Sequence, residues 1–418
     1  MSIGYACHSI ALPGSDIKSC TLKNATEEHL LSLIGHNLNS LETAVDYNIR
    51  NGIRIYRISS DLIPFGSSIA SGTSWQRVYA AKLKSIGERI IAGGLRVSMH
   101  PGQYTVLNSP DASVAERAVL DLDYHTTILD SMGLASEHKI VLHLGGAYGN
   151  KKQAIARFVS RCKELALAVH SRLVLENDDT LFNIQEVLEA AYSAEIPVVY
   201  DNLHNAVNPA DTDSTDIDWI RRCSGTWRKR DGLQKIHYAQ QHSQKKPGAH
   251  SETIYIDRFL EFYRQLSDRD IDIMLEVKDK NISALKCINC VSNRGINALE
   301  AEWARYKYGV LERSPNAYQA IRQLLRNKST YPAVEMYRMI EKSYSMPIAA
   351  GNAVNAAQHV WGYFKDKASE PEKKQFQSLM AKAGSSESGV LSIKNYLLRL
   401  ALKYHEAYLL NGYYLYKS

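Results

Sequence analysis

Eight short runs rich in valine, isoleucine, leucine and tyrosine alternate with longer segments of helical period in the first two thirds of the chain. The runs are nearly continuous in hydrophobicity, which is typical of parallel strands that are buried on both faces. This alternation therefore predicts an α/β fold with a parallel sheet. The runs read IGYAC (from Ile3), IRIYRIS (from Ile53), RVSMH (from Arg96), KIVLHLG (from Lys139), RLVLEND (from Arg172), IPVVYDN (from Ile196), QKIHYAQ (from Gln234) and DIMLEVK (from Asp272).

The segments between the runs carry helix start and stop signals. Thr26 precedes a helical pattern that stops at Gly52, and further patterns run from Trp75 to Gly94 and from Ala154 to His170. Eight β-then-α units of this size match a closed (β/α)8 TIM barrel of about 250 residues. A doubly wound open sheet is the rival, but no glycine fingerprint follows the first run. We expect the barrel domain over residues 1–295.

From about Ala301 the alternation stops, and the remaining patterns are helical. Apolar and tyrosine positions recur three or four residues apart, and strand candidates are absent. Breaks at Pro332 and Pro347 and the polar segment GSSESG after Ala383 indicate turns. We therefore expect a separate all-helical domain of unknown role over residues 300–418.

Composition and charge exclude several classes of protein. With 45% hydrophobic and 22% charged residues, the chain is typical of a soluble globular protein, and no apolar run is long enough for a membrane span. The N-terminus enters a strand pattern without a basic leader, which predicts a cytoplasmic protein without a signal peptide. Six cysteines are too few for a disulfide framework, and the one CxxC, Cys287 and Cys290, is half of a zinc site at best. A net charge of +6 is compatible with nucleic-acid binding.

Ionisable side chains recur at the ends of the predicted strands, which in a barrel converge on one mouth. A lone histidine there is more often a hydrogen-bonded core residue than a ligand. Burying so many ionisable groups together, however, requires compensating charge. Imidazoles mixed with carboxylates are the ligands of zinc, manganese or iron, and their number indicates two or three ions. The candidate residues are His100, His143, Glu176, Asp201, His204, Lys235, His237, His250 and Glu276.

A cluster of divalent ions favours phosphodiester hydrolysis, because such ions activate water, hold a phosphate oxygen and stabilise the leaving alkoxide. We take Glu176, Lys235 and His237 as the candidate catalytic residues. An ammonium beside cations is repelled, so Lys235 is neutral, or is carbamylated by CO₂ into a further ligand, or points outward to a DNA phosphate.

Two other functions remain open: an enzyme of another class on the same barrel, and a DNA-binding scaffold that acts through the helical domain. A metal-dependent sugar isomerase or epimerase would use fewer ligands in an enclosed pocket. A non-catalytic DNA-binding scaffold would bind without nicking, and the full ligand set disfavours it.

The stretch RVSMHPGQYTVLNSP places Gln103 and Tyr104 side by side on a Pro-Gly turn just past His100. An amide and an aromatic at the mouth could enter a duplex, one filling the gap and the other stacking on bases. An ordinary surface loop is the alternative. Further candidates for contact with DNA are Tyr5, expected to face the same mouth, Arg57, for which a structural ion pair is equally open, Ser59 and Asn108.

The strand-end motifs resemble, in order, those of the UV-damage endonucleases, a family related by fold and metal site to the metal-dependent apurinic/apyrimidinic endonucleases. The resemblance covers roughly residues 1–290 and rests on many motifs, each at a strand end. The segments read GYAC, YRISSDLIPFGS, SMHPGQYTVLNSP, HLGGAYGNK, LENDD, YDNLHN, KIHYAQQ and MLEVKDK.

This resemblance implies a DNA-repair endonuclease that nicks double-stranded DNA 5′ to pyrimidine dimers and (6–4) photoproducts, and often at abasic sites. It implies three divalent ions, typically manganese, with zinc or magnesium as alternatives, and a carboxylated lysine at Lys235. Gln103 and Tyr104 match the pair that probes the duplex, and Tyr5 matches the pocket for flipped bases. We also expect a monomer associated with the bacterial nucleoid. The ligands implied are His100, His143, Glu176, Asp201, His204, His237, His250 and Glu276.

The chain departs from the family pattern in two places. In GYACHSIALPG, His8 and Ser9 replace the Asn-Leu that often follows the cysteine, which leaves the shape of the lesion pocket open. The helical extension lies beyond the family core, and its segment HVWGYFK is similar to a small helical domain of unknown function in other bacterial proteins.

Overall fold

The computed structural model describes residues 1–266, 270–383 and 387–416. The chain divides into two compact units. The first comprises Met1–Ser9, Gly14–Ile254 and Glu261–Leu285, and the second comprises Ile10–Pro13, Tyr255–Leu260 and Lys286–Ser418. Because two short segments from the first 260 residues group with the second unit, the units interleave along the chain. The domain boundaries expected from the sequence, 1–295 and 300–418, stay predictions.

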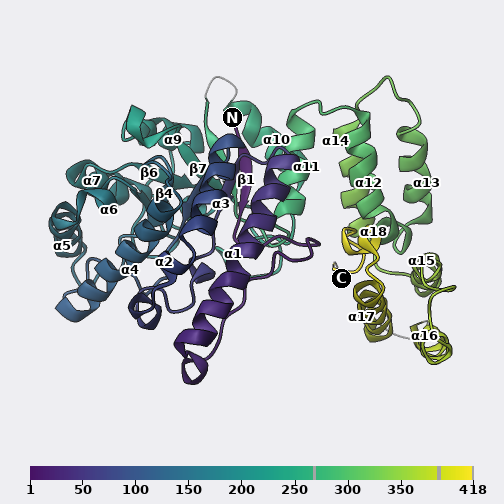
Figure 1. Cartoon of the computed structure of the whole chain (residues 1–418). Helices are drawn as coiled ribbons and strands as arrows, with labels where there is room; N and C mark the ends of the chain where they lie inside the picture. Colours follow the sequence, from purple (N-terminus) through teal and green to yellow (C-terminus); the bar gives the residue numbers. More distant parts are fainter. Residues whose placement is uncertain (267–269, 384–386, 417–418) are drawn as a thin grey trace. The chain divides into compact units, whose positions relative to one another are not determined.

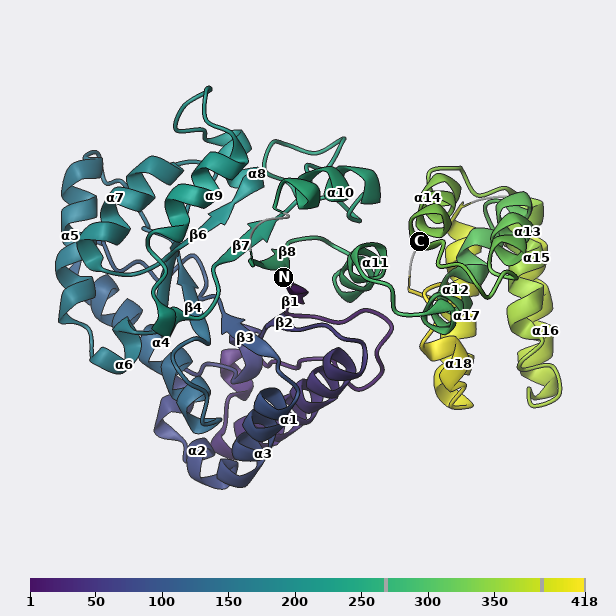
Figure 2. The same ribbon diagram turned by 90° about the horizontal axis from the view of Figure 1, so that it is seen from above.

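The first unit contains eight parallel strands that pair in sequence order and close into a barrel (Figure 1). The last strand pairs with the first through contacts such as that of Tyr5 with Leu275. Seen from above, helices surround the strands (Figure 2). The (β/α)8 prediction is therefore confirmed, and the open sheet is excluded. The strands are β1 (Ile3–Ala6), β2 (Ile55–Arg57), β3 (Arg96–Met99), β4 (Lys139–Leu142), β5 (Leu173–Glu176), β6 (Val198–Asp201), β7 (Lys235–Tyr238) and β8 (Asp272–Leu275).

The helices between the strands begin and end largely where the sequence predicts. Thr26 caps the first long helix, and its side chain accepts a hydrogen bond from the backbone N–H of His29 at 3.3 Å. The helices are α1 (Glu27–Arg50), α2 (Trp75–Val78), α3 (Ala80–Ala92), α4 (Ala112–Ser131), α5 (Lys151–Glu164), α6 (Leu167–His170), α7 (Ile184–Ala194), α8 (Asn202–Val207), α9 (Asp216–Ser224), α10 (Ile256–Gln265) and α11 (Asn281–Val291). Short 3₁₀ helices are η1 (Leu22–Asn24), η2 (Ser60–Leu62), η3 (Ile69–Gly72) and η4 (Lys229–Asp231).

Two of the predicted helical segments are broken. The segment from Trp75 to Gly94 is interrupted at Tyr79, whose hydroxyl donates to the Leu31 carbonyl of α1 at 2.7 Å. The segment from Ala154 to His170 is interrupted between α5 and α6, where the backbone of Leu165 is extended. Apolar periodicity continues across both breaks, so the sequence pattern alone does not reveal them.

Apolar side chains fill the barrel below the strand ends. Side chains two positions apart on a strand point to the same face. Glu176 and Asp201 follow the buried Val174 and Val199 by two positions and therefore point into the barrel at its carboxyl end. The sequence thus places a polar layer directly above an apolar one. One interior cluster contains Val141, Val174 and Val199 with Trp227 against it, and another contains Ala6, Ile55 and Met274.

Beyond Leu285, the described residues form helices and no strand, as the sequence predicts. Apolar periodicity does not predict α16, although Ser369 and Glu372 provide a capping signal, with the Ser369 backbone N–H donating to Glu372 at 2.9 Å. Of the predicted turn GSSESG, residues 384–386 lie outside the described residues, and the remainder begins α17 instead. The helices are α12 (Ile296–Leu311), α13 (Pro315–Leu324), α14 (Ala333–Tyr344), α15 (Ala350–Trp361), α16 (Glu370–Ala383), α17 (Glu387–Lys403) and α18 (Ala407–Leu410).

The helical unit has its own buried core, in which apolar side chains of α12, α15, α16, α17 and α18 pack together. An ion pair is buried beside it: Lys394 of α17 donates to Glu312, which follows α12, at 2.7 Å. Throughout the described ranges, we find no helix with the length and apolar character needed to cross a membrane.

Candidate active site

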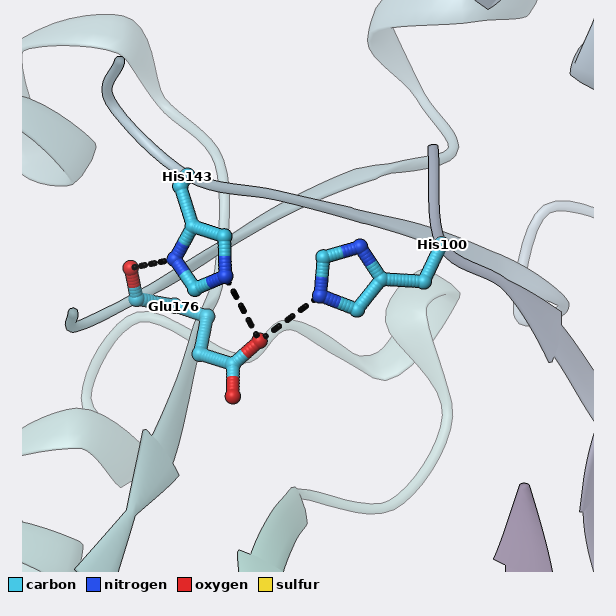
Figure 3. Close-up of side chains that lie close together, drawn as sticks. All are labelled: His100, His143 and Glu176. Carbon is cyan, nitrogen blue, oxygen red and sulfur yellow. Dashed lines mark hydrogen bonds and ion pairs between the residues drawn. The ribbon is translucent and has the colours of Figure 1, made fainter. Parts of the chain in front are cut away.

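Glu176, the last residue of β5, lies at the centre of the predicted strand-end cluster. Its carboxylate is 1% exposed. The Oε2 atom is 3.1 Å from Nε2 of His100 and 3.6 Å from Nε2 of His143 (Figure 3). The Oε1 atom is 2.6 Å from Nδ1 of His237 and 3.7 Å from Nδ1 of His204. One carboxylate therefore faces four imidazoles, carried by β7 and by the segments that follow β3, β4 and β6.

Two groups of potential ligands share this carboxylate. The first is His100, His143 and Glu176, and the second is Glu176, Asp201, His237 and Glu276. In each group, one ligand atom from every residue lies within 4.8 Å of the others. The eighth candidate, His250, lies at the edge, with Nε2 3.8 Å from Oε2 of Glu276. The structure thus brings all the predicted ligands into one region, and Glu176 belongs to both groups.

Backbone carbonyls orient three of the imidazoles. The Nδ1 atoms of His100, His143 and His204 lie 3.1, 3.3 and 2.8 Å from the carbonyl oxygens of Pro101, Glu176 and Asn177, respectively. An Nδ1–H that donates to a carbonyl leaves the lone pair on Nε2, which is the arrangement typical of metal-binding histidines. The sequence does not reveal these partners, because any residue supplies a carbonyl.

The carboxylate of Asp201 has one oxygen whose surroundings fit a cation. Asp201 ends β6 and caps α8, with Oδ1 accepting the backbone N–H of His204 at 2.8 Å. Its other oxygen, Oδ2, is buried and has no hydrogen-bond partner among the described residues. A buried carboxylate oxygen without a donor is unfavourable, and a divalent cation would stabilise it. The oxygen and imidazole donors together therefore fit divalent metal ions.

Burial and neighbouring charges shift the pKa values of the carboxylates at the site in opposite directions. Burial would raise the pKa of Glu176, but His237 and His143 hold this pKa well below its usual value. Burial raises the pKa of Asp201 to about 7, although His204 opposes the shift. Burial lowers the pKa of His100 to about 4, which favours the neutral imidazole that binds metals.

Arg57 supplies a fixed positive charge inside the barrel. Its guanidinium donates to Oε1 of Glu276 at 2.5 Å and lies 3.0 Å from Nε2 of His237. Of the two interpretations of Arg57, the structure shows the ion pair, and contact with a DNA phosphate stays a prediction. Ser59 is also buried, and its side chain accepts the backbone N–H of Asp61 at 3.2 Å.

Lys235 begins β7, two positions before His237 on the same interior face of the strand. It is 3% exposed, so the interpretation in which it points outward to a DNA phosphate is wrong. Within the described residues, no carboxylate forms an ion pair with its amine. Burial, together with Arg96 and Arg57, holds the pKa of Lys235 well below its usual value.

The turn after β3 presents Gln103 and Tyr104 to solvent, as the sequence predicts. Tyr104 is 69% exposed, and the turn is closed by the Thr105 N–H, which donates to the Gly102 carbonyl at 3.0 Å. A Cβ at Gly102 would lie 2.4 Å from the Tyr104 ring, so a larger residue there would displace the ring. This pair of side chains is available to a ligand at the mouth.

Two other residues that the sequence predicts to contact DNA, Asn108 and Tyr5, are buried. Asn108 is fully buried, and it donates to the Gly146 carbonyl at 2.8 Å and accepts the Gly146 N–H at 3.2 Å. It therefore joins the loops after β3 and β4. The expectation that Tyr5 presents its ring at the mouth is corrected, because the ring is 0% exposed and packs on Tyr56. The Tyr5 hydroxyl lies 2.5 Å from that of Ser9. Lesion-contacting roles for Asn108 and Tyr5 stay predictions.

A buried network on α4, which the sequence analysis missed, supports the mouth. Thr105 donates to Asp121 at 2.6 Å, and His125 lies 2.9 Å from the Ser60 hydroxyl. That hydroxyl donates to the His100 carbonyl at 2.7 Å. The signal in the sequence is an aspartate and a histidine four residues apart on one face of a helix.

The fold and the strand-end chemistry define a TIM-barrel protein with a candidate site for more than one divalent ion. Residues 1–307 match the family model described as UV-endonuclease UvdE. Residues 307–417 match a second model, described as Protein of unknown function (DUF1722). The second match covers the region whose segment HVWGYFK suggested a helical domain of unknown function.

Similar proteins carry names that correspond to the first family model. The UV DNA damage endonuclease of Clostridium perfringens (strain 13 / Type A) is 36% identical over 408 residues, which is 96% of each chain. That of Bacillus cereus (strain Q1) is 30% identical and covers 72% of this chain and 98% of its own. The crystal structure of SacUVDE is 34% identical, with a TM-score of 0.66, and covers 70% of this chain and 98% of its own. The chain belongs to the UV-endonuclease UvdE family.

Proposed function

We propose that this chain is a metal-dependent endodeoxyribonuclease that nicks double-stranded DNA 5′ to UV photoproducts. Family membership supports UV DNA damage endonuclease activity. The observation that carries the metal dependence is the position of Glu176, which two groups of potential ligands share. A sugar isomerase or epimerase would not require so large a ligand set or the exposed Gln103–Tyr104 pair.

The chain's own residues would hold a cluster of three divalent ions, with manganese preferred over zinc or magnesium. Such ions supply an activated water and stabilise the leaving alkoxide of an in-line displacement. Glu176 would contribute to both ligand groups, and Arg57 would hold Glu276 and His237 in place. The proposed ligands are His100, His143, Glu176, Asp201, His204, His237, His250 and Glu276.

We further propose that Lys235 is carbamylated and acts as an anionic group beneath the ligands. CO₂ adds to a neutral amine to form a carbamate and releases one proton. Two observations support this: the amine has no ion-pair partner in the described chain, and burial, together with the Arg96 and Arg57 charges, lowers the pKa of Lys235 and so favours the neutral amine. Both guanidiniums would stabilise a negative charge at this position. The test is incision by Lys235→Ala with and without short-chain carboxylic acids, which would restore activity by replacing the carbamate.

Gln103 and Tyr104 would enter the duplex at the lesion, the amide filling the gap and the ring stacking on a base. Pyrimidine dimers and (6–4) photoproducts weaken base stacking and pairing, so the energetic cost of opening the duplex is lower there. Abasic sites lack the base altogether and are further substrates by the same reasoning. We expect the enzyme to act as a monomer on nucleoid DNA in the bacterial cytoplasm.

A labelled duplex tests the proposal. A 5′-labelled strand with one defined pyrimidine dimer is incubated with the full chain and Mn²⁺, beside the same duplex without the dimer. We expect one incision, immediately 5′ to the dimer, and none after addition of EDTA. No incision, together with turnover of a free ketose, would instead support an isomerase or epimerase.

A further inference from the structure

The loop after β4 carries an exposed tyrosine to which neither the sequence motifs nor the proposed mechanism gives a role. Tyr148 is 47% exposed and lies between His143 and the first residue of α5, Lys151. In a TIM barrel this loop lies at the mouth, because it follows the carboxyl end of a strand. Tyr148 therefore lies on the same face of the barrel as the ligands.

The loops after β3 and β4 have the same local pattern. In each, a glycine lies two or three positions after a candidate metal ligand and is followed by one residue and an exposed tyrosine: Gly102-Gln-Tyr104 after His100 and Gly146-Ala-Tyr148 after His143. A Cβ at Gly102 would lie 2.4 Å from the Tyr104 ring, and one at Gly146 would lie 2.7 Å from the Tyr148 ring. Each ring thus folds back over a glycine that leaves space for it.

The turn itself does not explain a tyrosine at this position. The Asn150 N–H donates to the Ala147 carbonyl at 3.0 Å, and the two central residues, Tyr148 and Gly149, have φ values of 49° and 75°. A turn with positive φ at both central positions favours asparagine or glycine first, because a bulky side chain is disfavoured there. Departures of this kind from local preference are concentrated at functional sites.

The surrounding residues hold both the ring and the loop in place. The Arg157 guanidinium carbon lies 5.5 Å from the centre of the Tyr148 ring, within the range of a cation–π contact. The Nε of Arg157 donates to the Asn108 carbonyl at 2.9 Å. Asn108 also exchanges two hydrogen bonds with Gly146, so one set of contacts links the loops of Tyr104 and Tyr148.

We propose that Tyr148 is a second aromatic contact for DNA and that its ring stacks on a base of the duplex held across the mouth. This proposal rests on the proposed DNA endonuclease function. An exposed aromatic side chain stacks on any base, because every base has a π face. Tyr148 would thus add affinity for opened DNA beside Gln103 and Tyr104, and Arg157 acts as a positioning residue for its ring.

Binding without cleavage tests the proposal. Fluorescence anisotropy with a labelled duplex that carries one dimer, in EDTA, compares the parent with Tyr148→Ala and Tyr148→Phe. We expect the Kd of Tyr148→Ala to rise about 10-fold, as for the loss of one base–aromatic stack, and that of Tyr148→Phe to stay within about 2-fold of the parent. Thermal unfolding of each variant confirms that the barrel is intact.

Tyr192 provides a matched control. It is 57% exposed near the carboxyl end of α7, which leads into β6 and therefore lies at the opposite end of the barrel. Tyr192→Ala should bind as the parent does. If Tyr148→Ala and Tyr192→Ala bind equally well, the inference about Tyr148 is wrong.

A base analogue distinguishes stacking from other causes. With 2-aminopurine at successive positions around the dimer, addition of the parent should quench fluorescence at one position at least, and Tyr148→Ala should lose that quenching while Tyr192→Ala keeps it. Equal quenching by both variants would overturn the proposal. If instead the parent neither binds nor nicks the damaged duplex, the proposed endonuclease function is wrong. That failure differs from the failure of the Tyr148 proposal, in which the parent and Tyr148→Ala bind the duplex equally well.

Discussion

The Nε2 atom of His100 lies 3.1 Å from the Oε2 atom of Glu176, although 76 residues separate them in the sequence. The closed barrel produces this contact, because His100 follows β3 and Glu176 ends β5 at the same mouth. Two strands that are not neighbours thus deliver an imidazole and a carboxylate to one point. The other strands also end at this mouth, which is why the candidate ligands lie close together.

Replacing Glu176 by glutamine should abolish incision without preventing binding to DNA. The amide removes the negative charge shared by the two ligand groups, so we expect the loss of at least one bound ion and a fall in incision rate of about 100-fold or more. Metal content by mass spectrometry and single-turnover incision measure the two effects. Glu189→Gln, on the exposed face of α7, is the control. Parental incision by Glu176→Gln would disprove the metal assignment.

Removing the Gln103 and Tyr104 side chains together should reduce the preference for damaged DNA. Loss of one stacking ring and one gap-filling amide should lower the ratio of damaged to undamaged binding by about 10-fold or more. Competition between the two duplexes in EDTA measures this ratio. An unchanged ratio would show that the turn is an ordinary surface loop.

The Asn108→Ala substitution should destabilise the barrel and separate the two mouth loops. It removes both partners of the Gly146 backbone, and unpaired buried groups of this kind cost about 1–3 kcal/mol. Urea unfolding measures the change in the free energy of unfolding. Asn108→Asp keeps the acceptor for the Gly146 N–H but places a second acceptor against the Gly146 carbonyl, so it should also lose stability. Parental stability of Asn108→Ala would contradict a structural role for the two hydrogen bonds.

The sequence was sufficient to predict the barrel and the gathering of the candidate ligands at its mouth, because both depend on strand periodicity. Glu176 and Asp201 each end a strand two positions beyond a buried valine, so both could be placed at the mouth before their partners were known. Contacts through backbone carbonyls, such as that of Asn177 with His204, could not be predicted, because they depend on loop geometry rather than residue type.

The predictions for Tyr5 and Lys235 were wrong or open because the sequence does not show whether these two side chains are buried. The chain position of Tyr5, at a strand end, suggested exposure, but the position does not specify which face of β1 carries the ring. Lys235 was open to three interpretations for the same reason, and its burial removes one of them. The apolar residues of α16 are too sparse to give a clear helical period, so periodicity alone does not predict this helix.

In the helical unit, the buried pair of Lys394 and Glu312 should be sensitive to single substitutions. Lys394→Met leaves the Glu312 carboxylate buried without its cation, and breaking such a pair costs about 3–5 kcal/mol. Lys394→Met combined with Glu312→Leu removes both charges and should recover most of the loss. Chemical unfolding of the parent and the three variants, including Glu312→Leu alone, measures the coupling. Additive effects in this cycle would show that the pair contributes nothing.

Anomalous X-ray diffraction from crystals of the full chain grown with Mn²⁺ tests the central claim most directly. We expect peaks within about 2.3 Å of the ligand atoms, with one carboxylate oxygen of Glu176 bonded to each of two ions. Ions bound elsewhere on the protein, with none within bonding distance of Glu176, His100 or His237, would contradict the proposed metal centre.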